Sequence, residues 1–288
     1  MTFRGDGPLD TSGVSGSGGG GRIAIGGGVG IIVAIVAVLF GVNPGDILGG
    51  GGGSGSSVAG QSTSDQQIDN QIRSCTIAKA NTDTICRIVA TTNSLDRVWP
   101  TLIEGYVKPK TRIFAQSVTT DGCGTASSDV GPFYCPGDQT AYFDPTFFAT
   151  LADRLGGSDA PLAQEYVVAH EFGHHVQNLM GTMDKAQRLG SAGPTSGSVR
   201  LELQADCYAG VWAYHADKGP DAMLEPLTQQ QISDVIVTAK AIGDDTLSGN
   251  NDSEGWTHGS SAQRVRWFST GYQSGDPRSC DTFSARSL

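Results

Sequence analysis

The sequence has no cluster of lysine or arginine residues. Lys and Arg together number 19 against 29 Asp and Glu, so the formal net charge is −10. Nucleic-acid-binding domains usually carry a basic patch, and anionic lipid surfaces attract basic segments. The composition therefore argues against nucleic acid as a partner and against peripheral binding to anionic lipid.

Charge is also missing from residues 23–45, which lie between Arg22 and Asp46. About 20 apolar residues in a helix suffice to cross a hydrocarbon core. Since no A-x-A-like cleavage site follows, we expect a retained transmembrane helix over 23–45, with a cleaved signal peptide as the alternative. Arg4 and Arg22 precede this segment, and the next basic residue is Arg73. The sequence thus predicts a single-pass cell-membrane protein with a cytoplasmic N-terminus and an extracytoplasmic domain.

Large apolar residues are scarce on both sides of this segment, and no internal repeat is present. Residues 1–22 are rich in Gly and Ser and predict a disordered cytoplasmic tail. Residues 46–64 have the composition of a flexible linker. We therefore expect the folded domain to span residues 65–288.

The six cysteines lack the C-x2-C spacing of zinc-finger sites. All of them follow the apolar segment, and an even number in an extracytoplasmic domain predicts disulfide bonds. Six cysteines allow 15 pairings. Short separations favour Cys75–Cys86 and Cys123–Cys135, which leaves Cys207–Cys280. The alternative is six free, buried thiols in a cytosolic protein.

Secondary-structure patterns place a few strands before a series of helices. The sequence predicts helical stretches in 65–103, strands over 111–118 and 140–144, and helices over 145–155, 161–181, 198–217 and 228–245. This order is typical of an α+β domain that is mostly helical with a small sheet.

One segment of the expected helix 161–181 carries the pattern H-E-x-x-H, as His170-Glu171-Phe172-Gly173-His174. Residues four apart on a helix share a face, so His170 and His174 can hold one Zn²⁺. Glu171 points to the side, where it can act as a general base toward the metal's water. A catalytic zinc site needs a third protein ligand and keeps an open position for that water.

The next predicted helix offers candidates for this third ligand. In LELQAD, Glu202 and Asp206 stand four residues apart on a helix rich in apolar residues. Buried carboxylates need partners, and a metal site supplies them. We expect Glu202 to be the ligand and Asp206 to accept a hydrogen bond from a ligand histidine. A solvated pair of acidic residues is the alternative.

For three further histidines and two arginines, the sequence gives weaker indications of a functional role. His175 points away from the ligand face and is expected to pack or to lie at the surface, and His215 ends a helix and favours capping. His258 lies in a loop and is either structural or a catalytic residue that stabilises the oxyanion. Arg264 and Arg266 could bind a substrate carboxylate, but surface salt bridges are the expectation.

The chain resembles a bacterial family of neutral zinc metallopeptidases through GCGTASSDVGPFYCPGD, TAYFDPTFF, VVAHEFGHHVQ, LELQADCYAGVWA, THGSSAQRVRWF and CDTF. The resemblance implies a zincin-like domain, in which the H-E-x-x-H helix runs beneath a small sheet whose edge strand binds the substrate backbone. TAYFD, residues 140–144, is the candidate for that strand. The glutamate of E-x-x-x-D is the third ligand in similar membrane-associated zincins, which matches Glu202.

These observations together predict a membrane-anchored zinc metallopeptidase that cleaves a peptide or protein substrate. His170, His174 and Glu202 would hold Zn²⁺, Glu171 would be the base, and His258 or a nearby tyrosine would stabilise the oxyanion. One alternative is a catalytically silent, zinc-stabilised envelope module that binds another protein. Another is an anchored structural protein whose histidines are incidental.

Overall fold

The computed structural model describes residues 2–16, 58–249 and 252–288, and of residues 58–64 only the backbone. The helices are α3 (Val58–Arg73), α4 (Ile77–Ala80), α5 (Thr84–Leu102), α6 (Thr146–Asp153), α7 (Pro161–Leu179), α8 (Thr182–Gln187), α9 (Gly197–Ala216), α10 (Gln229–Ala241), α11 (Asp244–Leu247) and α12 (Ser261–Ser274). The strands are β1 (Val14–Gly16), β2 (Lys110–Ile113), β3 (Ser117–Thr119), β4 (Thr125–Ser127), β5 (Phe133–Cys135) and β6 (Thr140–Phe143). The 3-10 turns are η2 (Ser128–Val130), η3 (Ser253–Gly255) and η4 (Pro277–Cys280).

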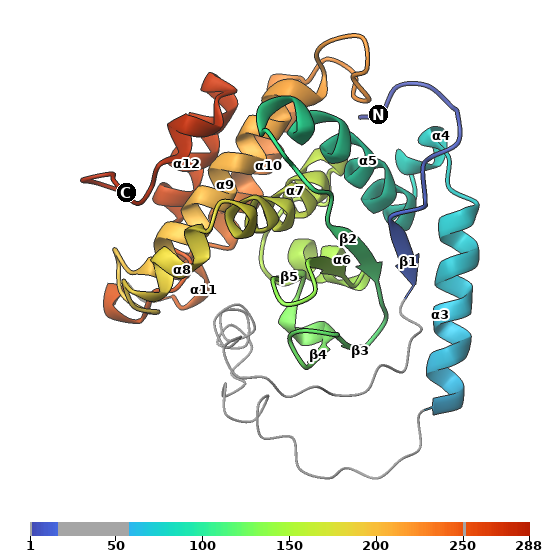
Figure 1. Cartoon of the computed structure of the whole chain (residues 1–288), viewed down its shortest axis with the longest axis horizontal. Helices are drawn as coiled ribbons and strands as arrows, with labels where there is room; N and C mark the ends of the chain where they lie inside the picture. Colours follow the sequence, from blue (N-terminus) through green and yellow to red (C-terminus); the bar gives the residue numbers. More distant parts are fainter. Residues whose placement is uncertain (1, 17–57, 250–251) are drawn as a thin grey trace.

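A four-stranded sheet, in the order β1-β2-β6-β5, lies beside the helices, as Figure 1 shows. β1, β2 and β6 run parallel, and β5 is antiparallel to β6 at one edge. β3 and β4 form a separate hairpin. The mostly helical domain with a small sheet was predicted, and the expected strand 111–118 is divided between β2 and β3, with Gln116 between them at a φ of 67°.

Local signals explain where the main helices begin and end. Pro161 is the first residue of α7, and Gly181 follows that helix in the left-handed region at a φ of 66°. The Ser196 hydroxyl accepts a hydrogen bond from the backbone N–H of Val199 and caps α9. α12 begins with a capping box formed by Ser260 and Gln263.

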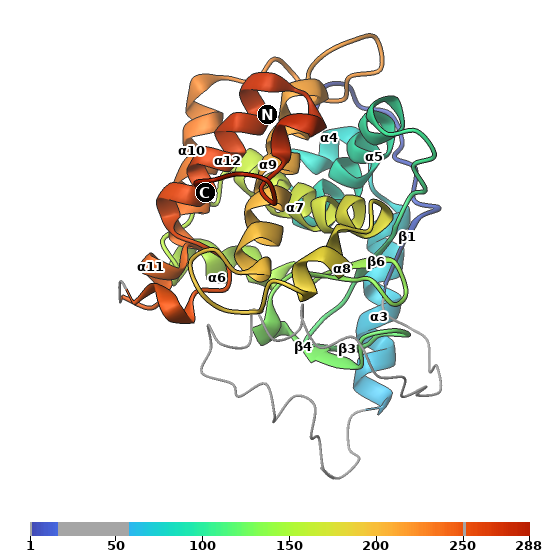
Figure 2. The ribbon, with the colours of Figure 1, turned by 60° about the vertical axis from the view of Figure 1, so that its left-hand side comes forward.

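α9 is the central helix, packed between α7 and α12, and Figure 2 shows the three helices from a second side. Glycines permit these close crossings. A Cβ on Gly173 of α7 would lie 3.0 Å from the Cα of Ala205. A Cβ on Gly210 of α9 would lie 2.1 Å from the Phe268 carbonyl oxygen of α12. A larger residue at either position would push the helices apart.

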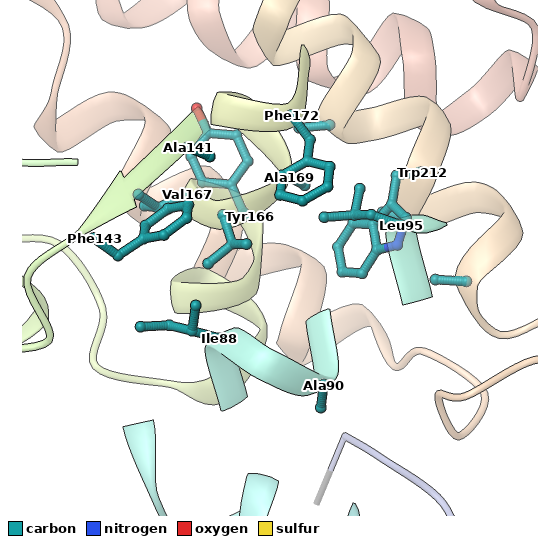
Figure 3. Close-up of a cluster of buried hydrophobic side chains, with 14 of the residues drawn as sticks. Ile88, Ala90, Leu95, Ala141, Phe143, Tyr166, Val167, Ala169, Phe172 and Trp212 are labelled. Atoms are coloured by element: carbon teal, nitrogen blue, oxygen red, sulfur yellow. The ribbon is translucent and has the colours of Figure 1, made fainter. Parts of the chain in front are cut away.

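The core joins the sheet to these helices. Ile88 of α5, Phe143 of β6 and Phe172 of α7 are buried in one cluster with Trp212 of α9, drawn in Figure 3. α7 also contacts both β5 and β6. The helix that carries H-E-x-x-H is therefore held by the sheet on one side and by α9 on another, and 16 residues of α7 are buried as a result.

The six cysteines form the three predicted disulfides, Cys75–Cys86, Cys123–Cys135 and Cys207–Cys280. The first closes the turn between α3 and α5. The second joins the loop between β3 and β4, which contains Cys123, to β5. The third joins α9 to η4 and thereby fixes the C-terminal segment against the central helix.

The predicted membrane-spanning helix is not supported. No helix among residues 58–249 and 252–288 is long and apolar enough to cross a membrane. Residues 23–45 themselves lie outside the described residues. The fold class that the described residues support is an α+β domain, mostly helical with a small sheet.

The N-terminal segment contradicts the expected single-pass location. Such a span would separate residues 2–16 from α3 by the membrane, yet β1 contacts α3, and the backbone N–H of Gly16 donates to Asp69 Oδ1 at 2.6 Å. β1 also pairs with β2, with Val14 opposite Thr111. A cytoplasmic N-terminus with the domain on the other side is therefore wrong.

The expected boundaries of the tail and linker change as well. Within 1–22, residues 2–16 are ordered, and Phe3, Leu9 and Val14 join the core, which the Gly/Ser-rich composition concealed. α3 begins at Val58, inside the expected linker 46–64. The part of that linker before residue 58 lies outside the described residues.

The burial of the N-terminal segment can be tested with Phe3→Ala. Phe3 is 2% exposed, and its backbone N–H donates to Asn81 Oδ1 at 3.0 Å. Loss of a buried phenyl ring should lower the free energy of unfolding by roughly 3–5 kcal/mol. Urea unfolding measures this, with Leu189→Ala as control, because Leu189 is 48% exposed. A loss in Phe3→Ala no larger than in the control would contradict the packing of this segment.

Candidate metal and active site

One face of α7 brings together the residues of the H-E-x-x-H pattern. His170, Glu171 and His174 are 7%, 6% and 3% exposed. Val167 shares this face, because residues at i, i+3, i+4 and i+7 line up along a helix. All four residues line one pocket. A helix with so many buried polar groups needs partners for them from neighbouring elements.

α9 supplies these partners across the Gly173–Ala205 contact. Glu202 Oε2 lies 3.1 Å from His170 Nε2, and Glu202 Oε1 lies 3.3 Å from His174 Nε2. One ligand atom from each of these three residues lies within 4.8 Å of the others. Ligands around a tetrahedral Zn²⁺ at 2.0–2.1 Å are separated by roughly 3.3 Å. The spacing and the donor set of two imidazoles and one carboxylate therefore fit a zinc ion.

The electrostatics of this cluster favour a cation. Burial disfavours charged imidazoles, but hydrogen bonds to Asp206 and Glu202 outweigh it and raise the pKa of His170 to about 10. Burial would raise the pKa of Glu202, yet the charges and hydrogen bonds of His174 and His170 hold it well below its usual value. Protons on the imidazoles thus balance the buried carboxylate charge, and a divalent ion would replace those protons.

The second nitrogen of His170 is held by Asp206. His170 Nδ1 lies 2.9 Å from Asp206 Oδ1. The same oxygen accepts hydrogen bonds from the Tyr166 hydroxyl at 2.5 Å and from Arg264 Nη2 at 2.9 Å. Such outer contacts fix a ligand imidazole's tautomer and direct its other nitrogen toward the metal.

The second nitrogen of His174 is held by a chain of amides. His174 Nδ1 lies 2.8 Å from Gln177 Oε1, and Gln177 Nε2 donates to the Leu201 carbonyl at 2.7 Å and to Gln204 Oε1 at 3.2 Å. Gln204 Nε2 in turn donates to the Cys280 carbonyl at 2.8 Å. This chain connects His174 to the segment that the Cys207–Cys280 disulfide holds against α9.

Glu171 lies beside the three candidate ligands and is not part of their cluster. Burial raises the pKa of its carboxyl, while the neighbouring His174 and His170 act in the opposite direction. A buried carboxylate whose pKa is raised by its surroundings is suited to accept and release protons.

His258 reaches the same pocket from the loop before α12. Its Nδ1 lies 3.1 Å from Asp244 Oδ1. Asp244 Oδ2 accepts hydrogen bonds from the backbone N–H groups of Thr257, His258 and Gly259 at 2.8, 2.7 and 2.9 Å. Burial would raise the pKa of Asp244, but its contacts with His258 and Gly259 lower it. A charged carboxylate therefore fixes both the loop and the ring.

The pocket and the open solvent at its mouth together occupy about 750 Å³. The segment that leads into β5 lines it with Val130, Gly131 and Pro132, and so does Phe133, the strand's first residue. This arrangement corrects the expectation for TAYFD. Residues 140–143 of this segment form β6, which lies between β2 and β5. The backbone N–H and C=O groups of β6 are therefore hydrogen-bonded to a neighbouring strand on both sides. The edge strand beside the pocket is β5.

The remaining candidates lie in different surroundings. Arg264 is 2% exposed and paired with Asp206, so the expected surface salt bridge is wrong for this residue. Arg266 is exposed, and its Nη1 donates to the Leu288 carbonyl.

His175 is buried between the Tyr134 hydroxyl and the Val107 carbonyl, and His215 contacts the Gly275 carbonyl. These last two histidines therefore have structural partners away from the pocket.

Four residues of the site were not identified in the sequence. Tyr166 stands one turn before His170, and Gln177 one turn after His174, so helical spacing could have indicated both. Gln204 lies between Glu202 and Asp206 on α9 and carried no separate signal. Asp244 is 14 residues from His258 and at the start of another helix. No periodic pattern connects such a pair.

Comparisons with known proteins agree with this geometry. A sequence profile of the family described as "Putative neutral zinc metallopeptidase" matches residues 7–283. Uncharacterized protein Rv2575 of Mycobacterium tuberculosis is 49% identical over 270 residues, which cover 88% of this chain and 86% of that protein. Uncharacterized protein YpfJ of Escherichia coli K12 is 37% identical over 262 residues, which cover 88% and 85%. No solved structure matches the chain.

The buried pair of Asp206 and Arg264 should behave as a unit. Arg264→Met leaves the carboxylate of Asp206 without its cation, which should lower the free energy of unfolding by roughly 3–5 kcal/mol. Asp206→Leu should cost a similar amount, and the double variant clearly less than the sum. Urea unfolding of the EDTA-treated proteins measures the three losses. Additive losses would show that the two side chains do not depend on each other.

Proposed function

Because this chain belongs to the neutral zinc metallopeptidase family, we propose that it is a zinc-dependent peptidase acting in the pocket beside α7. The proposal rests mainly on one observation, the buried cluster of His170, His174 and Glu202 with its ligand atoms within 4.8 Å. Glu171 beside this cluster supports a hydrolytic role, since a purely structural zinc site needs no base.

We assign the metal ligands to His170, His174 and Glu202, with Asp206 and Gln177 orienting the two imidazoles. Bound there, Zn²⁺ would polarise the scissile carbonyl and lower the pKa of a water molecule toward about 7. Asp206 is assigned the orienting role rather than that of a ligand, because its Oδ1 contacts the ring nitrogen of His170 that faces away from Glu202.

Glu171 is the general base in this proposal. Its carboxylate accepts a proton from the attacking water as the oxygen bonds to the carbonyl carbon. The same carboxyl then gives that proton to the amide nitrogen as the C–N bond breaks. Burial raises the pKa of this carboxyl, so the same group can take up a proton in the first step and release it in the second.

His258 is assigned to the oxyanion. With Nδ1 held by Asp244, Nε2 is the nitrogen that can donate to the negative oxygen that develops on the substrate. Tyr166 is a less suitable donor, since its hydroxyl is already bonded to Asp206. Asp244 acts as a positioning residue that keeps the imidazole in this orientation.

Substrate-backbone pairing is assigned to β5. An extended peptide can add only to the edge of a sheet, and β5 is the edge strand that leads into the pocket. Gly131, two residues before β5, has a φ of 76°, so a side chain would be strained there.

The alternative function is a zinc-stabilised module that binds another protein without cleaving it. Both functions require the metal ligands, so metal content does not separate them. Turnover does, and Glu171 is the residue on which they differ.

The ligand assignment can be tested by metal analysis of the oxidised full-length chain. We expect about one zinc per wild-type chain and little in Glu202→Ala, since that variant keeps only two protein ligands. Inductively coupled plasma mass spectrometry measures the content. Asp184→Ala on the exposed side of α8 is the control and should keep its zinc. A folded wild type without zinc, or a Glu202→Ala variant with full zinc, would contradict the site.

The hydrolytic role can be tested with Glu171→Gln. The amide cannot take the proton from water, so kcat/KM should fall by at least about 10²–10⁴-fold while zinc content stays at the wild-type level. Peptide-library cleavage followed by mass spectrometry measures both proteins. Equal cleavage by the variant and the wild type would remove Glu171 from the mechanism. A zinc-loaded wild type that cleaves nothing would favour the binding module.

A further inference from the structure

The pocket has a second half that the proposed chemistry does not use. Its lining residues are apolar, and all but Val167 come from elements other than α7 and α9: Phe133, Phe147, Leu151, Leu155, Val167 and Ile242. Apolar side chains that line a pocket together with a few convergent polar groups are typical of a ligand-binding site.

This apolar half begins next to the proposed reacting atoms. Val167 lies on α7 one turn before Glu171 and three residues before His170. These residues share one helix face, so the apolar wall continues the surface on which the candidate base stands. A peptide with its scissile bond at Glu171 would therefore place an adjacent side chain against Val167.

The six apolar residues that line this half include no charged side chain. Among the described residues that line the pocket, the charged ones other than histidine are Glu171, Glu202 and Arg264. Glu202 is engaged with both imidazoles, and Arg264 with Asp206. A glutamate side chain that entered here would lose hydration without gaining an ion pair, and a lysine would find only Glu171, the proposed base.

The walls are held in place by the surrounding structure. Leu151 is 0% exposed, and the loop after α6 closes over it through the hydrogen bond from Gly157 N–H to the Leu151 carbonyl at 2.9 Å. At another lining residue, Arg264 Nη1 donates to the Ile242 carbonyl at 3.3 Å. The arginine that pairs with Asp206 therefore also fixes this wall relative to the metal cluster.

We infer that the apolar half is a specificity subsite for one large apolar side chain adjacent to the scissile bond. The substrate class would be peptides with Leu, Ile, Met or Phe at that position. This inference rests on the proposed function and adds a substrate preference to it. Filling such a site in place of Ala should raise kcat/KM by roughly 10–200-fold.

The experiment uses the full-length, zinc-loaded chain and a peptide library in which each residue type occurs at every position. Cleavage sites are read by mass spectrometry, and kcat/KM is then measured for peptides that differ only at one flanking residue: Ala, Leu, Phe, Lys or Glu. The inference predicts that Leu or Phe exceeds Ala by at least about tenfold at one flanking position and that Lys and Glu are cleaved least. Cleavage without an apolar preference at either flanking position would overturn it.

Phe147→Asp tests whether this wall sets the preference. The new carboxylate should reduce the Leu-to-Ala ratio by about tenfold or more and raise the rate for Lys relative to Leu. Ala149→Asp places the same charge on the exposed side of α6 and is the matched control. An unchanged profile in Phe147→Asp, or the same change in both variants, would overturn the assignment to this wall.

Binding to Glu171→Gln separates this inference from the proposed function. Calorimetry with the same peptides measures affinity without turnover. If the wild type cleaves nothing but Glu171→Gln binds Leu and Phe peptides at least about tenfold more tightly than Ala peptides, the subsite stands and the peptidase proposal fails. If the wild type cleaves nothing and binding shows no apolar preference, the subsite is overturned as well.

Discussion

The close contact between α7 and α9 is the constraint on which the site depends. At Gly173 the two backbones approach so closely that a Cβ would lie 3.0 Å from the Ala205 Cα. That approach places the Glu202 carboxylate 3.1 Å from His170 Nε2 and 3.3 Å from His174 Nε2. The glycine of H-E-F-G-H is therefore as much a part of the metal geometry as its histidines, because a side chain there would separate the third ligand from the other two.

The same contact concentrates charge on side chains that are almost fully buried. Glu202 and Asp206 are 4% and 0% exposed, and charges so buried require partners. Arg264 offsets Asp206, while Glu202 has only the two imidazoles. In the absence of a cation these imidazoles must hold protons, so ion binding and proton release are linked, and affinity for a metal should rise with pH. The metal thus completes a charge balance that the protein alone meets only by protonating its ligands.

Features of the fold and the site could be predicted from the sequence when the residues that form them lie close together along the chain. The pairs His170/His174 and Glu202/Asp206 are four residues apart within one helix, so spacing alone indicated that they share a face. The two disulfides whose cysteines are 11 and 12 residues apart could be predicted for the same reason. β1, by contrast, pairs with a strand nearly a hundred residues away, and its Gly/Ser-rich surroundings suggested disorder. Asp244 and His258 meet through a loop, and the interior position of β6 depends on the order of the strands. Such features depend on tertiary packing, which no local pattern encodes.

The division of the pocket has a physical reason in the fold. The polar half is built from α7 and α9, whose positions are set by the glycine contact, so its geometry tolerates little change. The apolar half comes from Val167 of α7 and from residues of α6 and the loop after it, the end of α10 and the start of β5, where no such glycine contact is required. Side-chain contacts can be repacked at modest cost, while a backbone crossing cannot. Arg264 joins the two halves, because one guanidinium contacts both Asp206 and the Ile242 carbonyl. Changes in the apolar wall can therefore alter which side chain is accepted without moving the ligands, provided that this arginine keeps both contacts.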